Sequence, residues 1–214
     1  AIQTNPWVPG EIVFCWETGG KAPQRTWTVK ADGTGLRPVF VEAEHDWVTH
    51  EAVITKDEVA VAIMGHRAIR ALDGSVAKVE STTANPGQED GWGISGTRAF
   101  ATGLAIINLR TRDYYLAGQT KSGSGLWHVS GSGDGRFAVG DDFNRDIWLI
   151  DRKNNEMMLL SSGHKATASD HPHPTFSPDG TKIQIQSAML SEDNRSMNIC
   201  VIKVPEAWLK RTYK

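Results

Sequence analysis

The sequence predicts an all-β protein that forms part of a β-propeller, and three observations lead to this prediction. Short runs rich in β-branched and aromatic residues alternate with tight turns, and the chain of 214 residues contains 21 glycines. A motif of strand, turn and strand recurs along the chain, and a second pair of strands follows each copy. Two copies start at His128 and His173, which are 45 positions apart. Four antiparallel strands in about 40 to 50 residues are typical of one propeller blade.

Four blades are predicted in order along one domain, residues 1–214. The first, near 2–44, combines NPWVPGEIVFCWE with RTWTVKADGTGLRPV. The second, near 45–118, begins at HEAVITKDEVAVAIM and resumes at LAIINLRTRDYYLAG. The third, near 126–163, combines HVSGSGDGRFAVGDD with DIWLIDRKNNEMMLL. The fourth, near 171–205, combines HPTFSPDGTKIQIQS with MNICVIKVPEAW.

An insertion interrupts the second blade. His50 and His128 are 78 positions apart rather than 45, which corresponds to about 33 added residues. The segment 71–100 is rich in glycine, serine and threonine and has little periodicity. It is therefore predicted to be a long loop over one rim.

The number of blades suggests that the propeller is larger than this chain. Four blades rarely close a ring, so we expect the chain to be the C-terminal part of a propeller of about seven blades. The first and last strands would then be open edges, through which copies could pair as a homo-oligomer. An open β-sandwich is the alternative fold, but it would not require one residue type at the same repeat position three times.

Composition and charge narrow the classes of partner. The formal net charge of -2 gives no reason to expect a nucleic acid or an anionic membrane as partner. No apolar run approaches the roughly 20 residues that would span a bilayer. Two cysteines, Cys15 and Cys200, do not make a disulfide framework and are compatible with a reducing compartment. We therefore expect a cytoplasmic protein, with the periplasm as the alternative.

Histidines mark the candidate site. The first strand of each blade lines the central channel, and His50, His128 and His173 share one repeat position on those strands. His171 lies two residues before His173, on the same face of a regular strand. Four imidazoles from three blades are thus predicted to converge, and neutral imidazole is the commonest nitrogen ligand for divalent metals. The alternative is that each histidine only hydrogen-bonds to a neighbouring blade.

Other polar residues are weaker candidates. Arg25 is predicted to start the third strand of its blade, where the alternative is an arginine on a solvated edge. Glu17 and Glu51 are possible channel carboxylates, although a surface or supporting role is more typical. Asp141 and Asp142 follow an inner strand and are candidates to hold a ligand histidine by a hydrogen bond. Three histidines lie off the shared position and are predicted to be ordinary polar residues: His45, His66 and His164.

Several stretches together resemble a known family. They are IVFCWETGG, QRTWTVKADGTGLRPV, DWVTHEAV, LWHVSGSGDGRFAVGDD, HPHPTFSPDGTKIQIQS and VPEAWLK. In this order they resemble the C-terminal half of the oligogalacturonate lyases, seven-bladed propeller enzymes that cleave short pectin fragments. The resemblance covers nearly all of the chain except the insertion. It is most specific in the His-Pro-His segment combined with Thr-His-Glu and Gln-Arg-x-Trp.

The resemblance implies a role for particular residues. A manganese ion would be held by His128, His171 and His173, together with a glutamine in the family. The histidine of Thr-His-Glu, which falls on His50, would be the Brønsted base. The arginine before the tryptophan, which falls on Arg25, would assist at the substrate.

Two departures from the family pattern concern the site. The family glutamine precedes the first histidine of His-Pro-His by three residues, and this position is Ala168 here. A water molecule is expected to replace that ligand, or the metal affinity to fall. The family segment Cys-His-Glu-Gly reads Cys-Trp-Glu-Thr in this chain, at residues 15–18.

These residues suit the chemistry of a lyase. Cleavage of a 4-linked uronide removes the proton next to a carboxylate, and a cation or an arginine offsets the charge that develops. A histidine can take the proton. The sequence therefore predicts a metal-dependent lyase for acidic oligosaccharides, although this chain without further blades is expected to have little activity. The alternatives are a non-catalytic TolB-like propeller that binds protein or glycan, and a metal-dependent hydrolase or epimerase.

Overall fold

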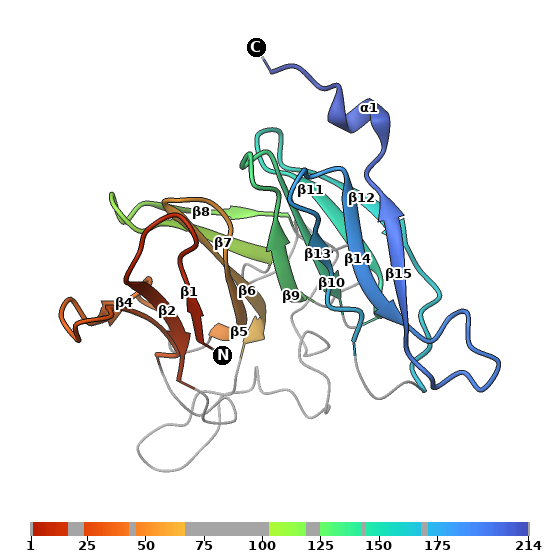
Figure 1. Ribbon diagram of the computed structural model, residues 1–214, viewed down its shortest axis with the longest axis horizontal. Coiled ribbons are helices and arrows are strands. Elements are labelled where there is room, and N and C mark those ends of the chain that lie inside the picture. Colours follow the sequence, from red (N-terminus) through yellow and green to blue (C-terminus); the bar gives the residue numbers. More distant parts are fainter. Residues whose placement is uncertain are drawn as a thin grey trace.

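The computed structural model describes residues 2–16, 24–42, 46–66, 103–118, 125–142, 144–167 and 171–213. Across these ranges every strand belongs to one of four antiparallel sheets, which follow one another in chain order (Figure 1). The predicted loop 71–100 lies outside the described residues, as do Glu17, His45 and Ala168. No helix in the described part of the chain is long and apolar enough to cross a membrane.

The first three sheets have four strands each. The first consists of β1 (Ile2–Thr4), β2 (Glu11–Cys15), β3 (Thr26–Lys30) and β4 (Arg37–Pro38). The second consists of β5 (Asp46–Val53), β6 (Glu58–His66), β7 (Gly103–Asn108) and β8 (Tyr114–Ala117). The third consists of β9 (Leu126–Gly131), β10 (Phe137–Asp142), β11 (Ile147–Asp151) and β12 (Glu156–Ser161). In each sheet neighbouring strands are consecutive in the chain, which is the meander of a propeller blade.

The fourth sheet has three strands in the described residues, so the prediction of a fourth strand there is wrong. It consists of β13 (Thr175–Phe176), β14 (Lys182–Ser187) and β15 (Asn198–Lys203). The following residues form the short helix α1 (Glu206–Leu209) instead of a strand. Pro205 precedes the helix and has no N–H to donate to a sheet, which explains why the strand stops. Trp208 is buried, with its ring centroid 5.9 Å from that of Phe137 in the third sheet.

The first strands of the sheets lie next to one another. Strand β9 contacts both β5 and β13, and β1 contacts β5. The first strand is also the edge of its sheet, so these strands are the inner strands of neighbouring blades. The fold class predicted from the sequence, an all-β propeller, is therefore confirmed.

The core lies between the sheets. Three apolar clusters of buried residues fill the spaces between the first and second, second and third, and third and fourth sheets. Middle strands of the second and third sheets are buried on both faces because these sheets are covered on two sides, whereas β14 of the fourth sheet is buried on one face only. In β10, for instance, all six residues are buried, including the consecutive Asp141 and Asp142. Two adjacent buried carboxylates in such a strand need hydrogen-bond partners.

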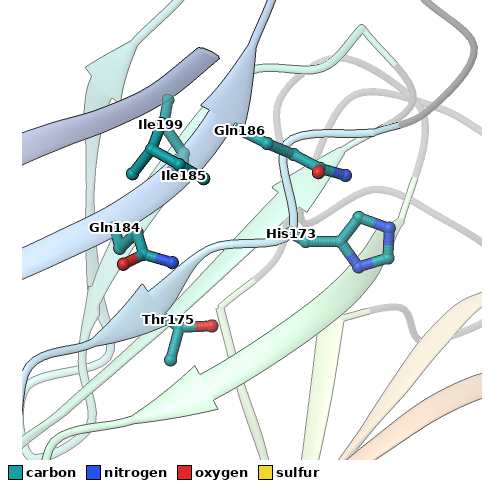
Figure 2. Close-up of a pocket in the computed structure, with 6 residues that line it drawn as sticks. All are labelled: His173, Thr175, Gln184, Ile185, Gln186 and Ile199. Carbon is teal, nitrogen blue, oxygen red and sulfur yellow. The ribbon is translucent and has the colours of Figure 1, made fainter. Parts of the chain in front are cut away.

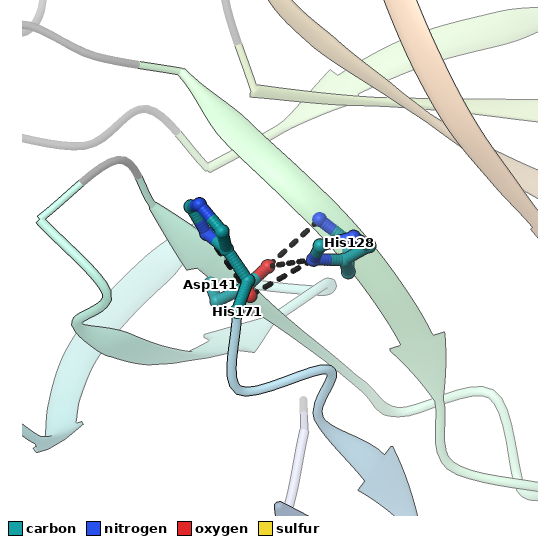
Figure 3. Close-up of side chains that lie close together, drawn as sticks. All are labelled: His128, Asp141 and His171. Carbon is teal, nitrogen blue, oxygen red and sulfur yellow. Dashed lines mark hydrogen bonds and ion pairs between the residues drawn. The ribbon is translucent and has the colours of Figure 1, made fainter. Parts of the chain in front are cut away.

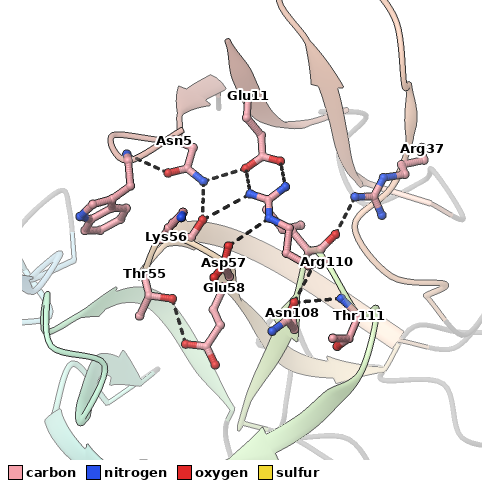
Figure 4. A network of polar contacts seen from close by, with 12 residues as sticks. Asn5, Glu11, Arg37, Thr55, Lys56, Asp57, Glu58, Asn108, Arg110 and Thr111 are labelled. Atoms are coloured by element: carbon pink, nitrogen blue, oxygen red, sulfur yellow. Dashed lines mark hydrogen bonds and ion pairs between the residues drawn. The ribbon is translucent and has the colours of Figure 1, made fainter. Parts of the chain in front are cut away.

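A polar network joins turns of the first and second sheets (Figure 4). Arg110 makes two 2.6 Å hydrogen bonds to the carboxylate of Glu11, and a third of 3.0 Å to Asp57. Asn5 donates to the same carboxylate at 2.7 Å. Burial would raise the pKa of Glu11, but the hydrogen bonds from Arg110 and Asn5 outweigh it and hold the pKa below its ordinary value.

The C-terminal segment folds back onto the third sheet. Arg211 lies 2.6 Å from the carboxylate of Asp151, which is fully buried at the end of β11, and Tyr213 donates a hydrogen bond to the same carboxylate at 3.1 Å. Arg136 donates to the carbonyl of Leu209 at 3.0 Å. These contacts attach the end of the chain to an earlier blade.

Candidate metal centre and base

A β-bulge places His128. Two residues of β9, Trp127 and His128, lie opposite one residue of β10, Asp141. Such a two-against-one arrangement bends the strand and redirects a side chain, and it is common beside active sites. The residue of β10 before Asp141 is Gly140, where an added Cβ would lie only 3.0 Å from the carbonyl oxygen of His128. The glycine therefore permits the close approach of the two strands at the bulge.

The second sheet has the same construction. Thr49 and His50 of β5 lie opposite one residue of β6, Ala62. The hydroxyl of Thr49 donates to the carbonyl of Trp127 at 3.2 Å, so a hydrogen bond links the two bulges directly. Two histidines thus leave neighbouring inner strands at equivalent positions.

The four histidines predicted to converge lie together. The ring centroids of His50 and His128 are 4.3 Å apart, and those of His128 and His173 are 3.6 Å apart. The centroid distance from His128 to His171 is 5.8 Å, and from His50 to His173 it is 6.5 Å. The cluster therefore draws its side chains from the second, third and fourth blades.

The prediction that His171 and His173 lie on the same face of a regular strand is wrong. Residues 171–174 precede β13 and are not a strand, so the two-residue period of a strand does not apply to them. The backbone of His173 has φ 48°, in the left-handed region that few residues other than glycine adopt. This unusual backbone turns the segment so that both rings still approach His128.

Hydrogen bonds hold this irregular segment. The backbone N–H of Gln186 donates to the carbonyl of Pro172 at 2.9 Å, and its side-chain amide donates to the carbonyl of His171 at 3.0 Å. Sequence reasoning did not identify Gln186, although the alternation in KIQIQS was a usable signal. Figure 2 shows its side chain above the ring of His173 at a pocket of about 340 Å³. Six residues line this pocket: His173, Thr175, Gln184, Ile185, Gln186 and Ile199.

Asp141 lies close to both His128 and His171 (Figure 3). Its carboxylate is fully buried and accepts a 2.8 Å hydrogen bond from the backbone N–H of His128. Nδ1 of His128 lies 3.0 and 2.9 Å from the two carboxylate oxygens, and Nδ1 of His171 lies 3.8 Å from one of them. His128, Asp141 and His171 each offer a ligand atom within 4.8 Å of the others, a spacing that could accommodate a metal ion.

His50 differs from the other histidines in its bonding. Its Nδ1 is buried and has no hydrogen-bond partner among the described residues. Burial, reinforced by the nearby His128 and His173, lowers the pKa of His50 to about 4. The ring is therefore neutral at pH 7 and has a nitrogen that can accept a proton.

Arg25 is not on a solvated edge, so that alternative is wrong. Only 6% of the residue is exposed. The guanidinium donates to the carbonyl of Val48, two residues before His50 on β5, and to Sγ of Cys15 at 3.0 Å. Its backbone N–H donates to the carboxylate of Glu42 at 3.0 Å. Arg25 is thus attached to the strand that carries His50.

Glu51, a candidate, and His164, predicted to be an ordinary polar residue, are both buried. Glu51, next to His50, is only 6% exposed, and its Oε1 has no hydrogen-bond partner in the described part of the chain. Burial raises the pKa of Glu51 to about 7. His164 is held between hydroxyl groups, with Nε2 2.9 Å from Oγ of Ser161 and Nδ1 2.7 Å from Oγ of Ser187. This is the ordinary polar role expected from the sequence.

Fold and site together define a β-propeller that carries a cluster of imidazoles around a buried carboxylate, with His128 buried and His173 exposed. No protein-family model matches the sequence, and no curated protein matches it. Solved structures do match. An oligogalacturonate lyase in complex with manganese has a TM-score of 0.68 and 18% identity, over 98% of this chain and 49% of the other.

Two other structures are similar. The oligogalacturonate lyase of Vibrio parahaemolyticus has a TM-score of 0.64 and 19% identity, over 97% of this chain and 49% of the other. The hydrazine synthase of Kuenenia stuttgartiensis has a TM-score of 0.54 and 13% identity, over 95% of this chain and 58% of the other. This chain therefore has the fold of the oligogalacturonate lyases and spans about half the length of both lyases.

Proposed function

We propose that this chain carries the reaction centre of a metal-dependent lyase that cleaves short 4-linked uronides, such as oligogalacturonate, by β-elimination. One observation carries the proposal above all: His50 is half-buried, its Nδ1 is buried without a hydrogen-bond partner among the described residues, and its ring lies beside a separate group of imidazoles. A proton acceptor beside a cation site is what this reaction needs. The similarity of the fold to oligogalacturonate lyases supports it.

The residues present fit a divalent cation. His128, His171 and His173 would hold it, because the rings of His171 and His173 both lie close to that of His128. Neutral imidazole is a good ligand for manganese and similar metals. When bound, the cation would offset the negative charge of the substrate carboxylate. Two further side chains of this chain would act on the substrate.

His50 would remove the proton next to the substrate carboxylate. At neutral pH the ring is uncharged, because burial lowers its pKa to about 4, so it can accept a proton. An anionic uronide bound nearby would favour the protonated ring and so raise this pKa toward neutrality. The proton goes to the imidazole, and the electron pair it leaves forms the new double bond. The C4–O4 bond breaks with its electron pair on the leaving oxygen, which takes a proton from water.

Arg25 would assist at the substrate. Its guanidinium is held at β5 close to the strand segment that carries His50, and an arginine can bind a carboxylate with two parallel hydrogen bonds. To do so it must exchange its bond to the carbonyl of Val48 for the substrate. The partner of this site is accordingly an acidic oligosaccharide.

The test is the ultraviolet absorbance of the conjugated unsaturated uronide, measured with the full-length protein, manganese and oligogalacturonate. We expect product formation with the wild type, and a rate lower by about 100-fold or more in His50→Ala, since a general base contributes about that much. The control is His164→Ala, which should retain the rate. Binding of the oligosaccharide without any product would contradict the proposal and indicate a binding module.

A further inference from the structure

We propose that Asp141 is a positioning residue, which holds His128 with its proton on Nδ1 and thereby leaves Nε2 as the nitrogen directed to a cation. The inference starts from the hydrogen bonds of the carboxylate. Both oxygens lie within 3.0 Å of Nδ1 of His128, and the backbone N–H of the same residue donates at 2.8 Å.

The chemistry of the pair determines which nitrogen carries the proton. An ionised carboxylate can only accept hydrogen bonds, so Nδ1 must be the donor. In a neutral imidazole the other nitrogen then has a free lone pair. Asp141 is fully buried, so water does not compete for this bond. Histidine ligands of metals generally donate their second N–H to such a partner.

Asp141 also supports the fourth blade. The backbone N–H of His173 donates to its Oδ2 at 3.4 Å, and this is the residue with the left-handed backbone. One carboxylate therefore orders a ligand candidate on β9 and the irregular segment before β13. Direct ligation of a metal by Asp141 would require it to give up these bonds, so positioning is the better account.

The second sheet is a natural comparison. There Ala62 occupies the place opposite the bulge, and Nδ1 of His50 has no partner among the described residues. Two histidines in equivalent positions thus differ in one feature, the carboxylate across the bulge. We infer that Asp141 directs His128 to a cation, whereas His50 remains available as a base.

This inference deepens the proposed function and rests on its metal-binding part, but its first test does not need a metal. Long-range ¹H–¹⁵N NMR of the metal-free full chain reports the tautomer of each histidine. We expect His128 to carry its proton on Nδ1, in contrast to most exposed histidines. A His128 ring protonated on Nε2 would overturn the inference, whether or not the protein is a lyase.

The second test measures manganese binding by titration calorimetry. In Asp141→Asn the affinity should fall about 10- to 100-fold, as for other partners of histidine ligands. The tautomer of His128 should also become mixed, because an asparagine can present either oxygen or nitrogen. Unchanged affinity and an unchanged tautomer would overturn the inference. If the variant does not fold, the tautomer of the wild type decides.

The matched control is Asp142→Asn. Asp142 is the adjacent carboxylate on β10 and is equally buried, but it accepts from Trp148, Asn144 and Asp146 in the turn beyond the strand. Its substitution should lower thermal stability and leave the manganese affinity within about twofold. If Asp142→Asn lowers the manganese affinity as much as Asp141→Asn does, the loss of affinity reflects a general loss of stability and the inference fails. If the wild type does not bind manganese, the proposed function loses its metal, while the tautomer still tests Asp141.

Discussion

The bulges of the second and third sheets share a construction and differ in their chemistry. In each, two residues of the inner strand lie opposite one residue of the next strand, and the second of the two is a histidine. Opposite His128 is a buried carboxylate, whereas opposite His50 is an alanine. The backbone therefore places the two histidines equivalently, and the residue across the bulge decides whether Nδ1 of the histidine has a hydrogen-bond partner among the described residues.

The largest expected effect separates these two histidines. His128→Ala removes a proposed ligand, so the manganese affinity should fall by about 100-fold or more, whereas His50→Ala should bind manganese within about threefold of the wild type. Titration calorimetry measures both. His164→Ala is the control, since His164 is buried but bonds only to Ser161 and Ser187 among the contacts described here. Equal losses of manganese affinity in His128→Ala and His50→Ala would show that the two histidines do not differ in their role.

The next effect concerns Glu51, on the other face of β5 from His50. Its pKa of about 7 in the folded protein exceeds the ordinary value of 4.5. Between pH 4.5 and about pH 7, Glu51 keeps its proton in the folded protein but has lost it in the unfolded chain. The free energy of unfolding therefore falls as the pH rises through this range. Glu51→Gln should remove this loss.

The measurement is the free energy of unfolding by urea at two pH values. Relative to the wild type, Glu51→Gln should be more stable at about pH 8 than at about pH 5, by roughly 2 kcal/mol. A constant difference at both pH values would show that Glu51 is ionised throughout. Glu42→Gln is a useful comparison, because that carboxylate accepts hydrogen bonds from Arg25 and Thr26 and its loss should destabilise the protein.

The smallest effect is expected far from the site. Arg110→Ala removes the ion pairs with Glu11 and Asp57 between the first and second sheets, and the arginine side chain is 40% exposed. Solvent screening limits the loss of stability to about 1 kcal/mol. Manganese affinity should not change. Arg112→Ala, which loses an exposed bond to the carbonyl of Pro38, is the matched control and should cost less.

The sequence predicted the blades and the gathering of the histidines because both follow from the repeat. A fixed spacing of four-stranded units implies that the inner strands adjoin, so residues at one repeat position come together even at large separations. His50, His128 and His173 are brought together in this way. Their proposed roles as base and ligands stay predictions.

What the sequence could not show depends on local register and backbone. A bulge adds one residue to a strand without any sequence mark, so the shared construction around His50 and His128 was not visible. The left-handed backbone of His173 could not be predicted, because this conformation is usually indicated by a glycine and the residue here is a histidine. The sequence names Asp141 and Asp142 as candidates to hold a ligand histidine by a hydrogen bond, but it does not show that Asp141 lies opposite the bulge, in contact with His128. The prediction of a fourth strand in the last blade overlooked that Pro205 cannot continue a sheet.

The attachment of the C-terminal segment to Asp151 bears on how the protein opens. Arg211 and Asp151 are 60 residues apart in sequence, and their bond ties the end of the fourth blade to the third. The two blades also share an apolar cluster that includes Trp208. They should therefore unfold cooperatively, as one unit of hydrogen exchange, rather than fray separately. His128 belongs to the third blade, and His171 and His173 belong to the fourth. The bond between Arg211 and Asp151 should therefore help to keep these histidines in their relative positions during local fluctuations.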